Sequence, residues 1–479
     1  MKIRSILSFI GFLLIFLGVC MLLPAVWAYY YGEAEILHFI AAAVVTSGIG
    51  FALRKGTSSD AGIHDREGFA IVSFGWSALA VFGALPFLMT GSIPSVTDAV
   101  FESMSGFTTT GASILPDVET LPKSVLFWRS FTHWLGGMGI IVISLAILPK
   151  LGIGGMQLFK AESPGPTKDK LTPRIRQTAA FLWGVYVLIS ALETVLLMLC
   201  GMDLFDALCH TFGTMATGGF STHNASIAAF ENPWIHWVII LFMFIAGTNF
   251  TLHYYALRGR PMRYFQDAEF RFYSAAVLIA VIAVFLSSRS SLQENGQSLR
   301  DVVFQVVSLI TTTGYITADY SKWHPFAVLI LLMLMFIGGM AASTGGGMKV
   351  IRAVIVMKHA HIEIKKLIHP NAVFPLRFGK RIIAQEVATN ILGFFLLFIV
   401  IFVAGGAVLL ILGLDFPTAL GASIACLANI GPGIGDVGPT GNYASMPLIA
   451  KWVLIMMMLM GRLELYTVLV LFSRSFWRR

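Results

Sequence analysis

Four short stretches of this chain share a spacing of threonine, asparagine and glycine that could bind a cation through backbone oxygens. Each stretch is apolar, about half as long as a membrane span, and ends on glycine; in chain order they read TDAVFESMSGFTTTG (97–111), FDALCHTFGTMATGG (205–219), RDVVFQVVSLITTTG (300–314) and PTALGASIACLANIG (417–431). Rings of backbone carbonyls can replace the hydration shell of an ion, and glycine allows the backbone conformations that this requires. Four such segments around one axis predict a pore, because non-helical backbone at membrane depth must be buried or line a water-filled path.

The composition is typical of a protein that crosses the membrane many times. The chain has 479 residues, of which 57% are hydrophobic and 12% are charged, whereas soluble domains carry roughly 25% charged residues. At about 20 residues for each crossing, the sequence predicts long apolar spans at 5–30, 36–54, 68–90, 125–148, 178–200, 234–257, 270–288, 325–351, 386–413 and 449–472. We therefore expect an all-α membrane protein.

The basic residues set the expected orientation. The formal net charge is +8, but most of the 33 lysines and arginines fall on alternate connections between spans, and the other connections carry mainly acids. By the positive-inside rule, this alternation predicts that both chain ends are cytoplasmic. The basic excess is therefore explained by topology, with some attraction to anionic membrane lipid, and not by nucleic-acid binding.

The four stretches belong to a longer repeat. Residues 1–65 hold two spans with no short stretch between them, and afterwards a unit of span, short helix, glycine turn and span recurs about every 100 residues. We predict an N-terminal two-helix segment at 1–65 and pore repeats at 66–176, 177–266, 267–384 and 385–479. The charge pattern requires the repeats to run in the same direction, so we expect four parallel membrane-loop-membrane repeats around one pseudo-fourfold pore.

The chemistry of the four turns favours a cation over an anion. Each short helix would end near the middle of the membrane, and a helix C-terminus carries partial negative charge. None of the four turns holds a basic residue. The acids Asp98, Glu102, Asp206 and Asp301, expected on the outer side, could concentrate cations at the mouth or cap the short helices; for the aspartates, capping is favoured.

A second feature interrupts the span predicted at 325–351. Glycine, serine and threonine crowd the stretch GGMAASTGGGMK (338–349), a composition that breaks helices. This stretch could be a flexible packing site between helices, or a loop that obstructs the pore. Arg462 lies within the last predicted span, where a charge costs at least about 2.5–3.5 kcal/mol and must face the protein interior or water. It could pair structurally with Glu464 or with carbonyls, or act as a positive barrier at the gate.

Two of the predicted cytoplasmic connections are long, at 149–177 and 352–385. The first is rich in turn residues, and the second contains HAHIEIKKLIHP, which predicts a short amphipathic surface helix that ends near Pro370. Neither connection is long enough for a nucleotide-binding domain, and no phosphate-binding or dinucleotide motif occurs. Any nucleotide input must therefore come from another polypeptide, and nothing in the sequence indicates an enzyme.

The sequence resembles the Trk/Ktr/HKT superfamily of potassium transporters, and within it the Trk branch, over essentially the whole chain. The motifs that carry the likeness are FESMSGFTTTGAS, WLGGMGIIV, GIGGMQLFKAESPGP, TGGFSTHNAS, GGMAASTGGGMKVIR, NIGPGIG and GRLELYTVLVLF. The resemblance implies potassium uptake across a bacterial inner membrane through a gated, cation-selective pore, with K⁺ as the bound ion and no organic cofactor. It also implies a homodimer and a cytosolic nucleotide-binding regulatory subunit of the TrkA type.

Carried over position by position, the resemblance implies a selectivity filter whose backbone oxygens bind K⁺, at Thr109, Thr110, Gly111, Thr217, Gly218, Gly219, Thr312, Thr313, Gly314, Asn429, Ile430 and Gly431. It implies a gate formed by Ser343, Thr344, Gly345, Gly346, Gly347 and Arg462. Glycine at 111 favours potassium, since a serine there accompanies sodium permeation in plant relatives. Asn429 and Ile430 replace a threonine pair, which suggests a looser selectivity. An ion-coupled (proton or sodium) potassium symporter is the alternative, disfavoured by the parallel repeats and by the lack of a mid-span array of carboxylates.

Overall fold

The computed structural model describes residues 3–55, 65–146, 171–294, 296–379 and 381–478. These residues are mostly helical, and the two strands among them, β1 (Arg377–Phe378) and β2 (Arg381–Ile382), form one short antiparallel hairpin. The expected all-α membrane protein is confirmed. Most of the connection 149–177, including the motif GIGGMQLFKAESPGP, lies outside the described residues.

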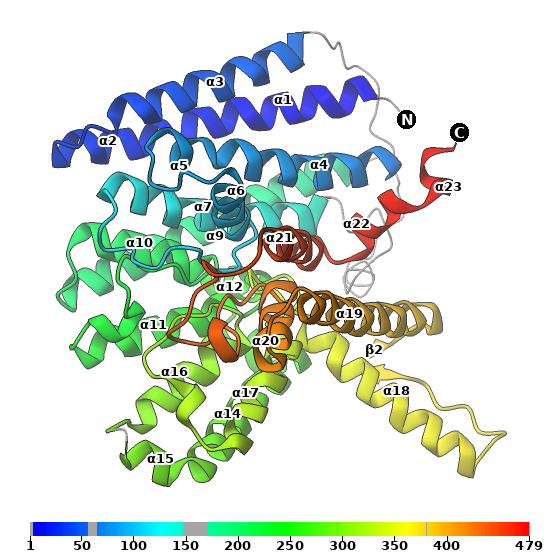
Figure 1. Ribbon diagram of the computed structural model, residues 1–479. Helices are drawn as coiled ribbons and strands as arrows, with labels where there is room; N and C mark the ends of the chain where they lie inside the picture. The colour runs from blue at the N-terminus through cyan, green and yellow to red at the C-terminus, as the bar shows by residue number, and fades with distance from the viewer. Residues whose placement is uncertain (1–2, 56–64, 147–170, 295, 380, 479) are drawn as a thin grey trace.

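Apolar helices of membrane-crossing length make up the body of the molecule (Figure 1). Each of the ten predicted spans overlaps at least one helix, and six stretches in the described part of the chain are helical, long and apolar enough to cross a membrane. These six are α1 (Ile3–Cys20) with α2 (Leu22–Tyr31), α3 (Ile36–Lys55), α4 (Asp65–Gly83) with α5 (Leu85–Met89), α9 (Leu171–Leu199), α14 (Ala268–Ser287) and α19 (Gln385–Ile411).

The first two spans form a hairpin at one edge of the molecule (Figure 1). α1 packs along α3 and also contacts α4. The two helices of the hairpin approach most closely at glycines: a Cβ on Gly11 would lie 2.5 Å from the carbonyl oxygen of Gly50. Small residues let membrane helices come this close, so van der Waals contact holds the hairpin together.

Four helices are too short to cross a membrane. They are α6 (Val96–Phe107), α10 (Leu204–Met215), α16 (Leu299–Ile310) and α20 (Phe416–Leu427), each of 12 residues. At 1.5 Å per residue each measures about 18 Å, against a hydrocarbon thickness of about 30 Å. Each packs against the long helix that precedes it and the helix that follows it, so the same three-helix arrangement occurs four times.

A polar residue occupies the N-cap of each of the four short helices, but two of the predicted capping residues are not the observed ones. Ser298 and Asp301 form a capping box, in which the Ser298 N–H donates to Asp301 over 2.9 Å. The other N-caps are Ser95, Asp203 and Asp415. The prediction that Asp98 and Asp206 are the caps is therefore wrong: both lie in the first helical turn, and other side chains bind them.

The helices that follow the short ones are α7 (Lys123–Ala146), α11 (Pro233–Ala246), α17 (Pro325–Ile337) and α21 (Leu448–Arg462). Three of the corresponding predicted spans are broken, whereas the sequence predicted a break only in 325–351. α11 bends by 103° into α12 (Phe250–Leu257), and α21 bends by 113° into α22 (Tyr466–Leu469). Asn249 caps α12 by accepting the N–H of Thr251, and Glu464 and Leu465 adopt positive φ. Asparagine is a strong helix-starting signal in mid-span, and it was missed.

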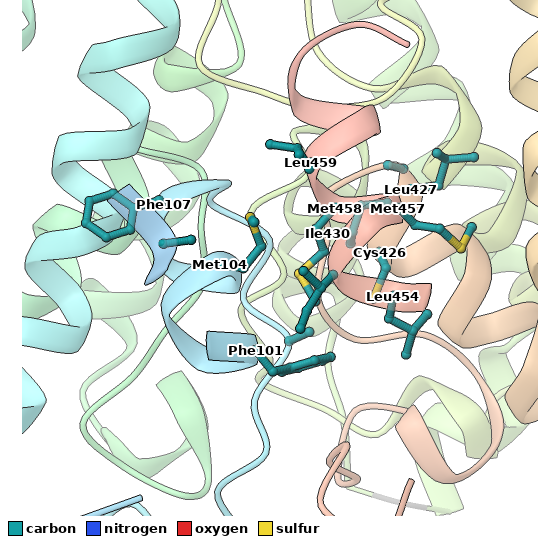
Figure 2. Close-up of a cluster of buried hydrophobic side chains, with 14 of the residues drawn as sticks. Phe101, Met104, Phe107, Cys426, Leu427, Ile430, Leu454, Met457, Met458 and Leu459 are labelled. Carbon is teal, nitrogen blue, oxygen red and sulfur yellow. The ribbon is translucent and has the colours of Figure 1, made fainter. Parts of the chain in front are cut away.

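A buried apolar cluster joins the end of the chain to its first half (Figure 2). α21 lies between α6 and α20 and contacts both. Phe101 and Met104 of α6, Cys426 of α20, and Leu454 and Met458 of α21 are all buried in this cluster. The last of the four units therefore packs against the first, and the four short helices surround one centre.

One helix leaves the bundle. α18 (Val350–Ile368) starts directly after the break in 325–351 and projects away from the other helices, with the β1–β2 hairpin beside it (Figure 1). It covers the predicted amphipathic surface helix, which is longer than expected and ends before His369. The remaining short helices connect these elements; they are α13 (Arg263–Gln266), α15 (Arg289–Glu294), α23 (Arg474–Trp477), η2 (Ser226–Ala229), η3 (Tyr320–Lys322), η4 (Gly435–Val437) and η5 (Val470–Phe472).

The packing of α6 on α7 makes a testable prediction. A Cβ on Gly136 of α7 would lie 2.1 Å from the carbonyl oxygen of Phe107, whereas a Cβ on Gly184 of α9 has no atom within 4 Å. We expect Gly136→Ala to destabilise the fold by about 1–3 kcal/mol through overpacking. Gly184→Ala, the matched control, is expected to be neutral or slightly stabilising. Thermal unfolding of the detergent-purified variants measures both; equal midpoints for the two would contradict this packing.

Candidate ion pathway and gate

The four short helices end in the same hydrogen-bonded turn. In each, an N–H donates over 2.8 Å to the carbonyl five residues earlier; the donors are Thr110, Gly218, Thr313 and Ile430. The N–H one residue before donates to the carbonyl three residues earlier, which completes a Schellman motif. This motif needs a left-handed residue, and the four that occupy the position are Thr109 (φ 50°), Thr217 (φ 54°), Thr312 (φ 60°) and Asn429 (φ 55°).

Left-handed threonine is unfavourable, and here it occurs three times. Glycine normally occupies this position, and another L-residue costs roughly 1–2 kcal/mol there. Two residues later the backbone is left-handed again, at Gly111, Gly219, Gly314 and Gly431, with φ between 79° and 93°. The surrounding packing therefore fixes an alternating backbone in four places, and strain of this kind concentrates at functional sites.

The four segments 109–111, 217–219, 312–314 and 429–431, which we call the ring segments, form a closed ring. A Cβ added to Gly111 would lie 2.0 Å from the carbonyl oxygen of Gly218. The same relation holds from Gly219 to Thr313 at 2.1 Å, from Gly314 to Ile430 at 1.9 Å, and from Gly431 back to Thr110 at 2.6 Å. The structure thus brings together all twelve residues that the sequence placed in the filter. Each glycine leaves room for the carbonyl of the neighbouring segment.

Eleven of the twelve carbonyl oxygens in the ring segments lack a donor among the described residues. Among the described residues, no hydrogen bond reaches any carbonyl of the ring segments except that of Gly431, which accepts from the Tyr443 hydroxyl over 2.7 Å. Buried carbonyls are almost always hydrogen-bonded. Since the ring residues are themselves almost wholly buried, their oxygens present a concentrated, unpaired negative potential.

The fourth segment is braced differently from the other three. The Asn429 side-chain nitrogen donates to the Thr110 hydroxyl over 3.0 Å and to the carbonyl of Met458 over 2.9 Å. In the first and third segments, hydroxyl pairs two residues apart lie 2.8 Å from each other: Thr108 with Thr110, and Thr311 with Thr313. Asn429 therefore ties the last segment to the first, and the ring is only pseudo-fourfold.

A cavity of roughly 200 Å³ opens on one side of the ring, lined by all four ring glycines together with Arg129, His223, Asn224 and Tyr443. Glu102, expected among the acids of the mouth, is instead fully buried behind this cavity. Its carboxylate pairs with Arg129 over 2.6 Å and accepts the N–H of Ile114 over 3.0 Å. Glu102 is therefore not an exposed acid that could concentrate cations at the mouth, because its charge is buried and paired with Arg129.

Charged groups also tie together the loops beside the cavity. His223 lies between Asp206, at 3.2 Å, and Glu119, at 3.6 Å. Asn224 donates to Asp117 over 2.7 Å and accepts the N–H of Val118 over 2.8 Å. The loop that follows the second ring segment is thus held to the loop that follows the first.

The glycine-rich break lies directly against the ring. Residues 338–349, which we call the gate loop, contain no helix. Gly346 donates its N–H to the Thr312 hydroxyl over 2.6 Å, and Gly347 donates to the carbonyl of Ala428 over 3.0 Å. The gate loop therefore contacts the third and fourth ring segments at the end where their short helices stop.

Arg462 lies on the other side of the gate loop. It is buried at the end of α21 and donates to the carbonyls of Thr344, over 2.8 Å, and of Gly136, over 3.3 Å. It does not pair with Glu464, which binds Arg352 of α18 over 2.5 Å. Of the structural alternatives, pairing with carbonyls is the observed one, and one of these carbonyls belongs to the gate loop itself.

Lys349 is a second cation of this site, and the sequence motifs did not identify it. Lys349 ends the gate loop with a positive φ of 73°, and its ammonium group donates to the carbonyl of Gly345. Two neighbouring carbonyls of the gate loop are thus bound by two side-chain cations. A lysine within a glycine-rich stretch at membrane depth is the signal that could have identified it.

This geometry defines a class of helical membrane protein. In it, four backbone segments with unpaired carbonyl oxygens form a closed ring, and a loop packs against that ring. Residues 32–479 match the TrkH family, described as a cation transport protein. The chain is 42% identical to the Trk system potassium uptake protein TrkH of Escherichia coli K12, over 100% of both chains, and 36% identical to TrkG of the same organism, over 99% of both. The crystal structure of the potassium transporter TrkH from Vibrio parahaemolyticus is similar at a TM-score of 0.92, with 38% identity and full coverage of both chains.

The chain belongs to the TrkH family, which is a family of transporters and not of enzymes. The resemblance noted in the sequence is therefore confirmed. The family and the apolar helices together make this a multi-pass membrane protein.

The ion pairs beside the cavity predict a pH-dependent stability. The hydrogen bond with Asp206 holds the pKa of His223 above its usual value of about 6.5. A raised pKa means that this contact stabilises the folded protein fully between about pH 4, where Asp206 is still ionised, and about pH 6.5, and that the stabilisation is lost as pH rises through the raised value. We expect the thermal midpoint of wild type to exceed that of His223→Gln at low pH, and the gap to narrow as pH increases. His361→Gln, on exposed α18, is the control; a constant gap across pH would refute the assignment.

Proposed function

We propose that this chain is a potassium uptake protein of the bacterial inner membrane, and that K⁺ crosses it through the ring. The observation that carries this proposal is the set of unpaired carbonyls in the ring segments. Backbone carbonyl oxygens that have no hydrogen-bond donor can coordinate K⁺ in place of its hydration water. The four converging helix C-termini add partial negative charge, which favours a cation. The relatives named potassium uptake proteins support the choice of ion.

In this proposal the twelve ring residues are the selectivity filter, and their backbone oxygens are the ligands. The four ring segments close one pore between the four predicted repeats, 66–176, 177–266, 267–384 and 385–479, with the N-terminal hairpin of 1–65 outside it. The Gly431 carbonyl, which accepts the Tyr443 hydroxyl, keeps a second lone pair for an ion. The predicted cytoplasmic location of both termini is supported by the position of α1 and α23, which begin and end on the same side of the bundle (Figure 1).

The gate loop and Arg462 form the proposed gate. Ser343, Thr344, Gly345, Gly346 and Gly347 lie between the ring and Arg462, in contact with both through the bonds described above. A fixed guanidinium charge beside the path repels K⁺, by about 4 kcal/mol for unit charges 4 Å apart at an effective dielectric constant of 20. Opening then requires that the gate loop and Arg462 move away from the ring.

Partners complete the proposal. The family resemblance supports a homodimer and a cytosolic nucleotide-binding subunit of the TrkA type that controls the gate. α18 continues directly from the gate loop, and Leu367 and Ile368 at its far end are 83% and 69% exposed. A subunit that binds this projecting helix would act on the gate loop through it. An ion-coupled (proton or sodium) symporter is the second candidate, and a fixed stoichiometry of K⁺ with a second ion would establish it.

The direct test is ion flux in liposomes that contain the purified protein alone, with a potassium gradient and with sodium in place of potassium as the control. Flux that is selective for potassium and stops at the electrochemical equilibrium supports a pore. Uptake of potassium against its own gradient, driven by a second ion, would contradict it.

The ring predicts an effect on selectivity. Gly111→Ser places a Cβ 2.0 Å from the carbonyl oxygen of Gly218 in the next segment, so the oxygen cage must widen locally. We expect sodium permeation relative to potassium to rise by about tenfold, which corresponds to about 1.4 kcal/mol of discrimination. Gly91→Ser is the matched control, since Gly91 is also left-handed but has no atom within 4 Å of the added Cβ. An unchanged potassium-to-sodium ratio in Gly111→Ser would contradict the filter assignment.

The gate predicts a gain of function. Arg462→Ala removes the donor to the Thr344 carbonyl and the charge beside the path. We expect potassium flux without the regulatory subunit to increase at least severalfold. Deletion of residues 345–347 should have the same effect by a different route, and Arg474→Ala, at the cytoplasmic end of the chain, should have none. If both gate variants are well folded by size-exclusion chromatography and neither raises flux, the gate model is wrong.

A further inference from the structure

Glu193 is a buried acid that neither the ring nor the gate uses. It lies in the second half of α9 (Leu171–Leu199), on the helix that packs against the second short helix, α10. Its side chain is completely buried, and neither carboxyl oxygen has a hydrogen-bond partner among the residues that the structure describes. An unpaired carboxylate in such a place is strongly unfavourable, and the group avoids the cost by holding a proton.

The hydroxyl groups around Glu193 show which protonation state fits. The polar side chain that faces it most directly is Thr214 of α10, and this hydroxyl already donates its hydrogen to the carbonyl of His210 over 2.8 Å. Tyr315 is also close enough to Glu193 for an electrostatic interaction. Its hydroxyl donates to the carbonyl of His210 as well, over 2.9 Å. Both hydroxyls therefore offer only lone pairs to the acid. A carboxylate would face acceptors, whereas a protonated carboxyl has a hydrogen to donate to Thr214.

The other groups near Glu193 do not supply a counter-charge. On α9 itself Tyr186 donates to the carbonyl of Trp134 over 3.3 Å, and α11 and α12 contribute the apolar side chains of Phe242 and Phe250 to the cluster around it. On the helices packed against α9, Arg129 pairs with Glu102 over 2.6 Å, His210 bonds the Ser221 hydroxyl, and His236 and His253 bond backbone carbonyls. His133 of α7 is buried with both ring nitrogens unpaired among the described residues, and Arg462 of α21 binds two backbone carbonyls. Within the described part of the chain, then, no cation pairs with Glu193.

We propose that Glu193 is a proton-binding site that supports the second ring segment. Thr214 lies three residues before Thr217, and the carbonyl of Thr214 accepts the N–H of Thr217 in the Schellman turn. A neutral carboxyl has a hydrogen that it can donate toward Thr214, directly behind this turn. Loss of the proton places a charge against the lone pairs of Thr214 and Tyr315, and so pushes the end of α10 away from the geometry that holds 217–219 in the ring. The ligand is a proton, and the site links proton concentration to a potassium pathway; this link, unlike the protonation itself, rests on the proposed function.

Infrared spectroscopy of the full-length protein in liposomes tests the protonation. The difference spectrum between wild type and Glu193→Gln at neutral pH is expected to contain the carbonyl stretch of one protonated carboxyl. Thr214→Val, which removes the acceptor, is expected to shift that band. Glu363→Gln is the control: Glu363 lies on exposed α18 and pairs with Lys366 over 2.7 Å, so its replacement is expected to leave the protonated-carboxyl region of the spectrum unchanged. A spectrum with no protonated-carboxyl band assigned to Glu193 would overturn the proposal.

Flux measurements test the link to the ring. Potassium flux through wild type is expected to fall as pH rises through the titration of Glu193, and Glu193→Gln, which stays neutral, is expected to keep its flux. The same pH dependence in both proteins would overturn the link. If the infrared band is present but no variant, including the gate variants, carries potassium, then the proposed function fails and the proton site stands.

Discussion

A backbone carbonyl that leaves its helix inside a membrane must find a donor or a cation, and the architecture of this protein follows from that constraint. Four short helices end at the ring, each in a Schellman turn whose N–H groups are hydrogen-bonded, whereas every ring carbonyl except that of Gly431 lacks a donor among the described residues. The left-handed Thr109, Thr217, Thr312 and Asn429 are unfavourable conformations, so packing must hold them. The long helices on both sides of each short helix supply that packing, and α21 closes the circle against α6 (Figure 2).

The gate satisfies the same constraint in a different way. The gate loop also exposes carbonyls in the membrane, but side-chain cations bind them: Arg462 binds that of Thr344, and Lys349 binds that of Gly345. The acid nearest in sequence, Glu464, binds Arg352 instead, so the charge of Arg462 has no carboxylate partner among the described residues. In the proposed pathway, a permeating K⁺ competes for oxygens of the same kind and is repelled by the same charges. The structure itself shows that side-chain cations bind these two carbonyls of the gate loop.

The features that could be predicted from the sequence are those that depend on residues close together in the chain. The four glycines at a common offset, the apolar spans and the glycine-rich break were all legible, because each reflects a requirement at that position alone. Features that depend on distant residues were not. The burial of Glu102 depends on Arg129, the role of Asp98 depends on Lys451, which binds it over 2.6 Å, and the pairing of Glu464 depends on a helix more than a hundred residues earlier. At the bend after α21, the left-handed positions are occupied by Glu464 and Leu465 and not by glycine, so the local sequence did not predict their positive φ.

The departure from fourfold symmetry is concentrated where the gate loop touches the ring. Gly346 and Gly347 donate to the Thr312 hydroxyl and the Ala428 carbonyl, at the base of the third and fourth segments, and no such donor reaches the first two segments within the described residues. Asn429 of the fourth segment in turn donates a hydrogen bond to the Thr110 hydroxyl of the first segment. A gate loop that leaves its seat removes donors from one half of the ring only. In the proposed gate, opening alters the support of the third and fourth segments while the first and second keep their own, so the proposal couples the gate loop mechanically to the ring.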